Sequence, residues 1–241
     1  VAESRAPQSY NATFTYPQRG AQQYVQALAQ GVRSDRISVG ERIMEIDVER
    51  KVAKTAKRAI QYDALVSTMP LPALLGMSGA RHEPAVFSHN KVLVFNLGFD
   101  RKGPEGVHWV YYPQRELSFY RVGFYDNIFG ARRMSLYVEV ALSGDASLTE
   151  HARRSMKARV LAELQTCGVV TGQSLVASHS VLLDPAYVHV TPEAIAEAAR
   201  QRASLATRDV HSIGRYGAWT YCSIEDNIIE ARALAERLDP R

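Results

Sequence analysis

Two segments of the chain combine an arginine with tyrosine and tryptophan, which are residue types suited to binding an anion. The first segment covers residues 108–123 and contains Arg121, and the second covers residues 213–223 and contains Arg215. A guanidinium can donate two parallel hydrogen bonds to a phosphate, and tyrosine hydroxyls add further donors. The two segments therefore predict a site for an anionic ligand. From spacing alone, an aromatic-rich sheet face on which Arg121 pairs with a carboxylate is the simpler interpretation of the first segment.

The first segment has the pattern of a β-hairpin that turns near Arg115. If the hairpin closes symmetrically there, Trp109 faces Arg121 and Tyr111 faces Phe119. Residues two apart along a strand point to the same side of a sheet, so these four side chains would share one face. We expect that face to present the arginine beside aromatic rings.

The second segment contains two glycines, Gly214 and Gly217, which permit close approach of the backbone to a ligand. If the segment is extended, Arg215, Trp219 and Tyr221 point to one side of it. This arrangement would place a second guanidinium beside aromatic rings, as in the first segment.

The last helix is predicted to begin at Ser223, which has the residue type of an N-cap. The free N–H groups and partial positive charge of a helix N-terminus favour an anion, or a ring that becomes anionic. The simpler alternative is a capped terminal helix after an aromatic loop, because Glu225 and Asp226 in its first turn also suit the helix dipole.

The remaining residues form no recognisable catalytic or metal-binding motif. The seven histidines include no pair with the spacing of metal ligands, and neither Cys167 nor Cys222 has a CxxC partner. A GxSxG elbow, a GxGxxG turn and a Walker loop are all absent from the sequence. We therefore predict no metal site and no side-chain nucleophile, and we assign no catalytic residue.

The composition is that of a globular protein, with 46% hydrophobic and 22% charged residues in a chain of 241. The formal net charge of +4 suits a small anionic ligand, but the basic residues are dispersed, so we expect no nucleic-acid partner. No apolar run reaches about 18 residues, so we expect no membrane-spanning helix. We expect a cytoplasmic protein, because two cysteines make no disulfide framework and no secretory signal precedes the fold.

Helical and strand-like segments are mixed along the chain without regular βαβ alternation, which favours an α+β fold. Apolar spacing predicts a first helix from residue 21, and residues 90–142 have the pattern of an antiparallel sheet. Ser147 and Glu150 have the spacing of a capping box before a long helix. Thr191, followed by proline, predicts the start of the next helix.

Taken together, the two arginine-containing segments resemble the UDP-galactopyranose mutases and their close relatives. The resemblance rests on residues 108–113 with 119–121, and on residues 214–221. These enzymes belong to the larger flavoprotein group of amine oxidases and protoporphyrinogen oxidases. Residues 14–20, Phe-Thr-Tyr-Pro-Gln-Arg-Gly, resemble the Tyr-Pro-x-x-Gly entry to a helix in that group, and residues 63–70 resemble its return strand ending in Ser/Thr-x-Pro.

The resemblance implies an enzyme that uses FAD, and it implies roles for particular residues. In the mutases the reduced flavin attacks the anomeric carbon of the sugar and displaces UDP, while protein groups bind and orient the substrate. The residues implied to bind the substrate diphosphate are Arg121, Arg215, Tyr111 and Tyr221, with Trp109 beside them. The residues implied to contact FAD are Gly214, Arg215, Ser223, Ile224 and Glu225 at the flavin and ribityl chain, Arg42 and Ile43 by the adenine, and Thr68 and Met69 at the cofactor wall.

The resemblance also implies a division of the chain into three portions. Residues 1–75 would be a partial, Rossmann-like FAD-binding portion, and residues 76–205 a substrate-binding domain with an antiparallel or mixed sheet. Residues 206–241 would return to the FAD-binding portion and end in a helix. The Gly-rich dinucleotide loop of the family has no counterpart here. We therefore expect a C-terminal portion of a larger flavoprotein, which is inactive by itself and binds FAD weakly or not at all, and whose partner is an N-terminal FAD-binding segment.

Two alternatives to a mutase-like protein acting on a UDP-sugar stay open. One is an FAD-dependent oxidoreductase of the amine oxidase type with an unknown small-molecule substrate. The other is a binding module that has lost catalysis together with its dinucleotide-binding domain.

Overall fold

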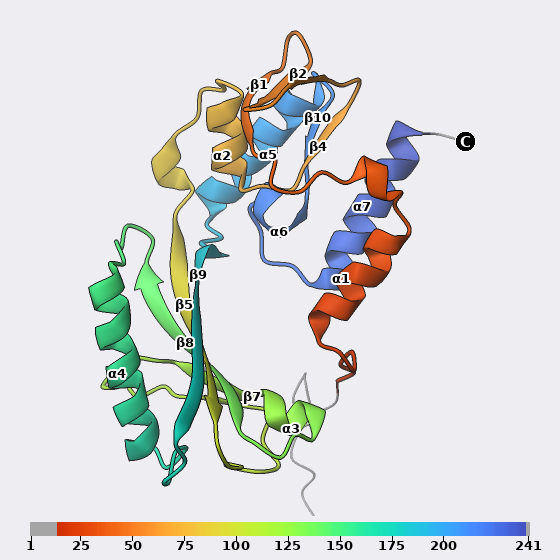
Figure 1. The fold of residues 1–241 in the computed structure, drawn as a ribbon. Helices are drawn as coiled ribbons and strands as arrows, with labels where there is room; N and C mark the ends of the chain where they lie inside the picture. The colour runs from red at the N-terminus through yellow and green to blue at the C-terminus, as the bar shows by residue number, and fades with distance from the viewer. Residues whose placement is uncertain (1–13, 240–241) are drawn as a thin grey trace, which may run out of the picture.

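The computed structural model describes residues 14–239, which form a mixed structure of helices and sheets around two packed cores (Figure 1). The helices are α1 (Ala21–Gln30), α2 (Leu71–Met77), α3 (Tyr125–Phe129), α4 (Glu150–Thr166), α5 (Pro192–Ala206), α6 (Gly214–Gly217) and α7 (Ile224–Leu238), with the short 3-10 helices η1 (Ser34–Arg36) and η2 (Pro84–Val86). The strands are β1 (Ile43–Asp47), β2 (Val52–Thr55), β3 (Ala59–Gln61), β4 (Leu65–Ser67), β5 (His89–Phe99), β6 (Trp109–Tyr111), β7 (Arg121–Phe124), β8 (Ser135–Ser143), β9 (Leu175–Val188) and β10 (Val210–Ser212). The predicted α+β class is confirmed.

The larger core lies between a five-stranded antiparallel sheet and α4. The strand order is β6-β7-β8-β5-β9. Along β5 and β8 alternate side chains are apolar and buried, as a strand with one face in a core requires. Phe95 and Val138 on this face belong to the same buried cluster as Val160 and Leu164 of α4. The antiparallel sheet predicted within residues 90–142 is therefore confirmed.

The other side of this sheet, which we call the open face, carries polar and aromatic side chains with a few aliphatic ones between them. In Figure 1, α4 covers the left side of the sheet, and the open face turns toward α7 and α1. Strand register and alternation place on the open face Trp109, Tyr111, Arg121, Tyr137, Glu139, Val94, Val181 and Leu183. The open face thus gathers the substrate residues implied for the first arginine-containing segment.

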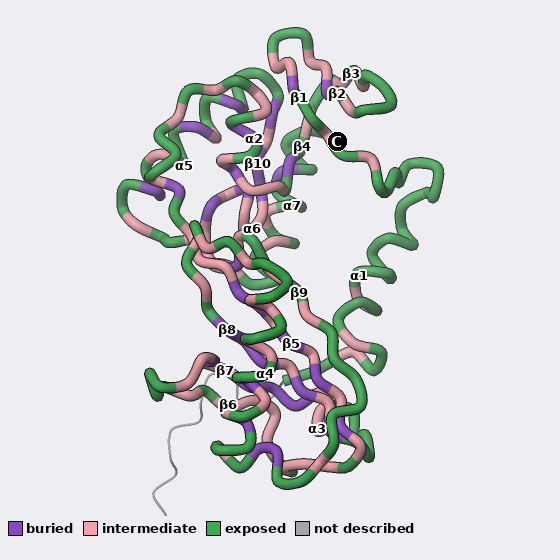
Figure 2. The backbone as a smooth tube through the Cα atoms, turned by 60° about the vertical axis from the view of Figure 1, so that its left-hand side comes forward, coloured by how far each residue is buried: buried purple, intermediate pink, exposed green. Residues whose placement is uncertain are grey.

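The second core surrounds the parallel strands β4 and β10. Leu74 and Leu75 of α2, Ala198 of α5 and Trp219 are buried together in it, and Ile46 attaches the β1-β2-β3 sheet to it. Helix α5 falls almost entirely within residues 76–205, the predicted substrate-binding domain. It packs in this second core, however, and not under the five-stranded sheet. Figure 2 shows buried segments in both cores, whereas α1 is exposed along its length.

Among residues 14–239, three α-helices begin with a side-chain cap, and the sequence predicts two of these caps. Thr191 caps α5 and Ser223 caps α7, as predicted. Helix α4 begins after Thr149, whose hydroxyl accepts a hydrogen bond in the first turn, so the predicted capping box of Ser147 and Glu150 is wrong. The described residues contain no helix that is long and apolar enough to cross a bilayer.

A buried ion pair anchors α3 to the five-stranded sheet. The Asp126 side chain has no exposed surface, and its Oδ2 lies 2.6 Å from Nζ of Lys102. Its Oδ1 accepts a hydrogen bond from the backbone N–H of Ser135, the first residue of β8. A buried carboxylate that loses its cation is left as an uncompensated charge away from water, which is costly.

We expect the substitution Lys102→Met to lower the free energy of unfolding by about 3–5 kcal/mol, because Asp126 would stay buried without its partner. The matched control is Lys54→Met, which breaks the exposed pair of Lys54 and Glu45 and should cost less than about 1 kcal/mol. Urea denaturation of the two variants measures both losses. Equal losses would contradict the assigned role of the buried pair.

Candidate functional site

The strands of the first arginine-containing segment pair in a register two residues away from the predicted one. Tyr111 lies opposite Arg121, and Trp109 lies opposite Gly123. The predicted facing pairs, Trp109 with Arg121 and Tyr111 with Phe119, are therefore wrong. Phe119 is buried in the larger core, and this takes it out of the strand, so that β7 begins only at Arg121. The prediction that Trp109, Tyr111 and Arg121 share one face is nevertheless confirmed.

Arg121 is held on the open face by an ion pair with Glu139 of the neighbouring strand β8. Only 10% of the Glu139 side chain is exposed, and its second oxygen accepts a hydrogen bond from the Tyr120 hydroxyl. The guanidinium also donates to the Tyr111 hydroxyl over 3.3 Å and lies over the ring of Tyr137. The simpler of the two interpretations of this segment, an arginine paired to a carboxylate, therefore describes Arg121 in this structure.

Burial and hydrogen bonding shift the pKa values within this cluster. Burial raises the pKa of Tyr120 well above its usual range, and the hydrogen bond to the Glu139 carboxylate raises it further. Burial opposes the charge of Arg121, but the hydrogen bonds with Glu139 and Tyr111 outweigh that effect and raise the pKa of the guanidinium. Arg121 and Glu139 thus form a stable pair that adds no net charge to the open face.

Arg215 lies against two tyrosine rings and has no carboxylate partner among residues 14–239. Its guanidinium carbon is 4.4 Å from the centre of the Tyr221 ring and 5.3 Å from the centre of the Tyr187 ring. One terminal nitrogen, Nη2, is buried without a hydrogen bond. Aromatic rings attract the face of a guanidinium and leave its edge free to donate hydrogen bonds. Arg215 therefore presents an uncompensated positive charge.

The second arginine-containing segment is a short helix and a turn, and not the extended strand considered from the sequence. Residues 214–217 form α6, and Trp219 follows with a φ of 53°. The Trp219 ring is buried in the second core against Phe87, so it does not share a side with Arg215 and Tyr221. The direction of the Trp219 side chain is set by the burial of its indole. The alternation of side chains along an extended strand does not apply, because this segment is not extended.

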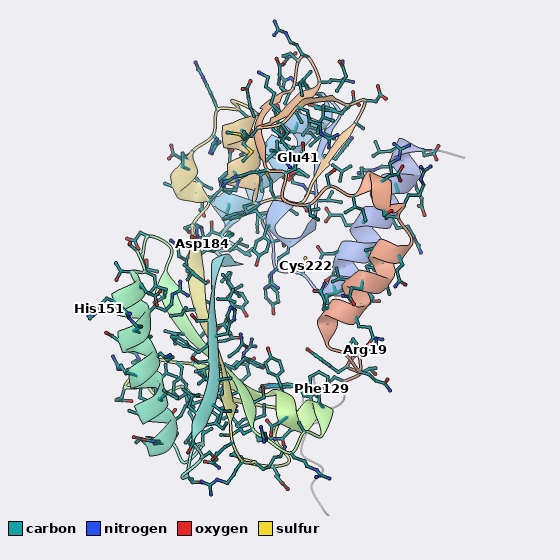
Figure 3. All side chains as sticks on the ribbon, in the orientation of Figure 1. Arg19, Glu41, Phe129, His151, Asp184 and Cys222 are labelled. Carbon is teal, nitrogen blue, oxygen red and sulfur yellow. The ribbon has the colours of Figure 1, made fainter. Side chains whose placement is uncertain are left out.

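The two arginines belong to the same side of the molecule but lie at different levels along the strands. Tyr187, one of the two rings beside the second arginine, is opposite Asn90 of β5, whereas Glu139 is opposite Val94. Four residues of strand span about 13 Å, so the two guanidinium groups are not side by side. Figure 3 shows Cys222, at the end of the second segment, on the other side of β5 and β9 from His151 of α4, so this segment lies on the side of the open face.

Two segments expected at the FAD meet at the carboxyl ends of the parallel strands β4 and β10. Thr68 and Met69 follow β4, and Gly214 follows β10 closely. The N–H of Ile213 donates to the carbonyl oxygen of Ser67 over 2.9 Å, which holds the two strand ends together. Ligands of open α/β sheets bind beyond the carboxyl ends of parallel strands. The structure thus brings Thr68, Met69 and Gly214 together at a place suited to a ligand.

The first turn of α7 is held beside the same strand end. The N–H of Gly214 donates to Oε2 of Glu230 over 2.8 Å, and the N–H of Arg215 donates to Oδ1 of Asn227 over 3.0 Å. Both acceptors belong to α7, so residues 223–225 at its start lie close to the second arginine. Gly214 has a φ of 80°, a conformation that other residues rarely adopt, which permits this tight turn between β10 and α6.

The α7 N-terminus retains two backbone donors for a ligand. Ser223 and Asp226 satisfy each other in a capping box, and no hydrogen bond within residues 14–239 uses the N–H groups of Ile224 and Glu225. The carboxylates of Glu225 and Asp226 offset the positive end of the helix dipole. This donor set fits the polar edge of a flavin or its ribityl chain better than it fits a phosphate.

Arg42 and Ile43, implied to lie by the adenine, are at the start of β1 and not at the carboxyl ends of β4 and β10. Arg42 is exposed just before β1, and Ile43 is half-buried against the second core. Within the described part of the chain, no hydrogen bond or ion pair joins either of them to Gly214 or to residues 223–225.

The sequence analysis did not identify Glu139 and Tyr187 as residues of the site. Glu139 is the one carboxylate within the otherwise uncharged strand β8, and that isolated charge was a usable signal. Tyr187 carried no local signal, because its place depends on an irregularity in β9 between the residues that pair with Asn90 and Val92.

Comparison with known proteins agrees with this architecture. A family model described as "Flavin containing amine oxidoreductase" matches residues 4–168. The fold is similar to that of a reduced UDP-galactopyranose mutase, with a TM-score of 0.76 and 23% identity over 88% of this chain and 48% of that one. A candidate protoporphyrinogen oxidase from Exiguobacterium sp. 255-15 gives a TM-score of 0.75 and 15% identity over 92% and 51% of the two chains. A CLA-producing fatty acid isomerase from P. acnes gives 0.65 and 16% over 90% and 52%.

The antiparallel sheet and the parallel strand ends together give this chain the fold of these solved structures. Because the family match covers more than half of the sequence, the chain belongs to the family of flavin containing amine oxidoreductases. The resemblance to the flavoprotein group of amine oxidases inferred from the sequence is confirmed. The chain spans about half the length of the solved structures it matches, and no curated protein sequence matches it.

We expect the substitution Gly123→Ala to disturb the open face and to lower the free energy of unfolding by about 1–3 kcal/mol. A Cβ at Gly123 would overlap the ring of Tyr137, which lies against Arg121. The control is Gly76→Ala, where the added carbon meets nothing within 4 Å and a helix gains propensity. Thermal denaturation with near-ultraviolet circular dichroism compares the variants, and a neutral Gly123→Ala would contradict the close packing of this ring.

Proposed function

We propose that this chain supplies the substrate-binding face and part of the FAD cleft of a flavin-dependent enzyme that acts on an anionic small molecule. The observation that carries the proposal is the position of Arg215. Its uncompensated guanidinium lies against Tyr187 of β9 and Tyr221, next to the strand ends and the helix start expected at the FAD. An anion bound there would be adjacent to a cofactor in the cleft.

The proposal divides the work between the two cores. Within residues 14–239, the β1-β2-β3 sheet, β4, β10, α2, α5 and α7 form the cofactor portion, and the five-stranded sheet with α3 and α4 forms the substrate portion. Thr68, Met69 and Gly214 line the cofactor wall at the strand ends, and residues 223–225 offer backbone donors. Arg42 and Ile43 serve the adenine end. FAD, when bound, supplies the covalent or redox chemistry, and the chain binds and orients the substrate.

We expect weak FAD binding by the chain alone, seen as localised shifts of backbone amides in nuclear magnetic resonance spectra. Riboflavin should shift the amides of Gly214, Ile224 and Glu225, because the flavin end contacts them. ADP should instead shift those of Arg42 and Ile43, and FAD should shift both sets. Shifts confined to other residues, or none at millimolar FAD, would refute the cofactor cleft proposed here.

A second candidate function is a mutase that binds the diphosphate of a nucleotide sugar. It is favoured by the fold of UDP-galactopyranose mutase and by the gathering of Arg121, Tyr111, Tyr221 and Arg215 on one side of the molecule. A diphosphate that used both arginines would require Arg121 to leave Glu139.

The mutase candidate predicts that UDP binds the chain and that Arg121→Ala weakens this binding by about 1.5–3 kcal/mol, the value of a charge-assisted hydrogen bond. Arg121→Lys should lose less, since it keeps the charge but not the planar fork. Isothermal titration calorimetry measures the affinity of UDP for the unchanged chain and for the two variants. UDP binding that is absent, or indifferent to Arg121, contradicts the mutase candidate and favours an oxidoreductase of the amine oxidase type.

A further inference from the structure

We infer that the substrate side of the open face takes a ligand with a single anionic group on an apolar body, such as a long-chain monocarboxylate. Glu139 is the residue that excludes ligands with two anionic groups. This inference rests on the proposed function, which places the substrate on the open face. It adds that the substrate has one anionic group and an apolar body.

The charge of the open face decides how many anionic groups a ligand can bring. Glu139 is buried and uses one oxygen for Arg121 and the other for the Tyr120 hydroxyl, so its charge is fully engaged. Arg121 in turn has its charge compensated, and its Nε is buried without a partner. A second anionic group near this pair would meet a guanidinium whose charge Glu139 already balances, so it would gain little attraction there.

Arg215 provides an anchor for an anion. Its guanidinium is not used by any carboxylate of the described residues, and Tyr187 and Tyr221 hold its plane. The planar fork matches a carboxylate, which accepts two parallel hydrogen bonds. Tyr221 is 70% exposed, so a ligand can approach this guanidinium from solvent.

Part of the open face, on β5 and β9, is aliphatic. Val94 and Val181 are opposite each other on β5 and β9, and Leu183 is one pleat nearer to Tyr187. Val181 and Leu183 are 38% and 44% exposed although they are large apolar side chains. Covering such side chains with an apolar body is favourable because it removes their surface from water. A ligand anchored at Arg215 can therefore lay an apolar body across Val94, Val181 and Leu183.

The test titrates the chain with decanoate, acetate and UDP by isothermal titration calorimetry. We expect decanoate to bind at least about tenfold more tightly than either acetate or UDP, since it alone meets both the anchor and the aliphatic surface. Arg215→Gln should weaken decanoate about tenfold or more. Leu183→Ser should weaken decanoate and leave acetate unchanged. The control Arg50→Gln, on the exposed turn after β1, should change nothing.

The variant Glu139→Gln tests the exclusion directly. It frees the Arg121 charge, so UDP should bind about tenfold more tightly than it does to the unchanged chain. If this variant does not fold, the double variant Arg121→Met, Glu139→Leu removes the pair without changing the net charge, and it should keep the preference for decanoate over UDP.

The inference is overturned if decanoate does not bind, if its binding ignores Arg215→Gln, or if the unchanged chain prefers UDP. The role assigned to Glu139 is overturned if Glu139→Gln leaves the affinity for UDP unchanged. It is also overturned if the double variant loses the preference for decanoate over UDP. None of these measurements requires FAD. A failure here is therefore distinguishable from a failure of the cofactor cleft, which the amide shifts produced by riboflavin and ADP report.

Discussion

The ion pair of Glu139 with Arg121 is the interaction on which the character of the open face depends. A carboxylate buried to this extent needs donors for both oxygens, and the neighbouring strand supplies them from two consecutive residues, Tyr120 and Arg121. Because the pair is neutral as a whole, Arg121 adds no positive charge to this side of the molecule, whereas Arg215 does. One acidic side chain thus balances one of the two guanidinium groups.

The two cores place complementary functions next to each other. Parallel strands expose their carboxyl ends as a group, so β4 and β10 bring the segments around Thr68 and Gly214 together without any local sequence motif. The antiparallel sheet buries one face against α4 and leaves the other for a ligand. Tyr187, on the sheet, and Arg215, beside the second core, join the two arrangements through their stacking contact.

Local sequence signals predicted a large part of the fold. Apolar spacing located α1, hydroxyl caps located the starts of α5 and α7, and alternation located the antiparallel strands, because each depends on residues a few positions apart. The predicted hairpin register is wrong, because the register depends on the burial of Phe119 in a core formed by residues distant in sequence. The predicted direction of the Trp219 side chain is wrong for the same reason, because its indole is buried beside Phe87.

The sequence by itself determined the α+β class, the membership of a flavoprotein superfamily and the residue types on the open face, because composition, periodicity and motifs are properties of neighbouring residues. Only the tertiary structure decided that Arg121 is neutralised and Arg215 is not. That difference depends on which strand lies beside β7 and on which rings pack at the start of α6, and Glu139 and Tyr187 reach these places from segments far along the chain. Charge compensation acts over a few ångströms in space, whatever the separation in sequence.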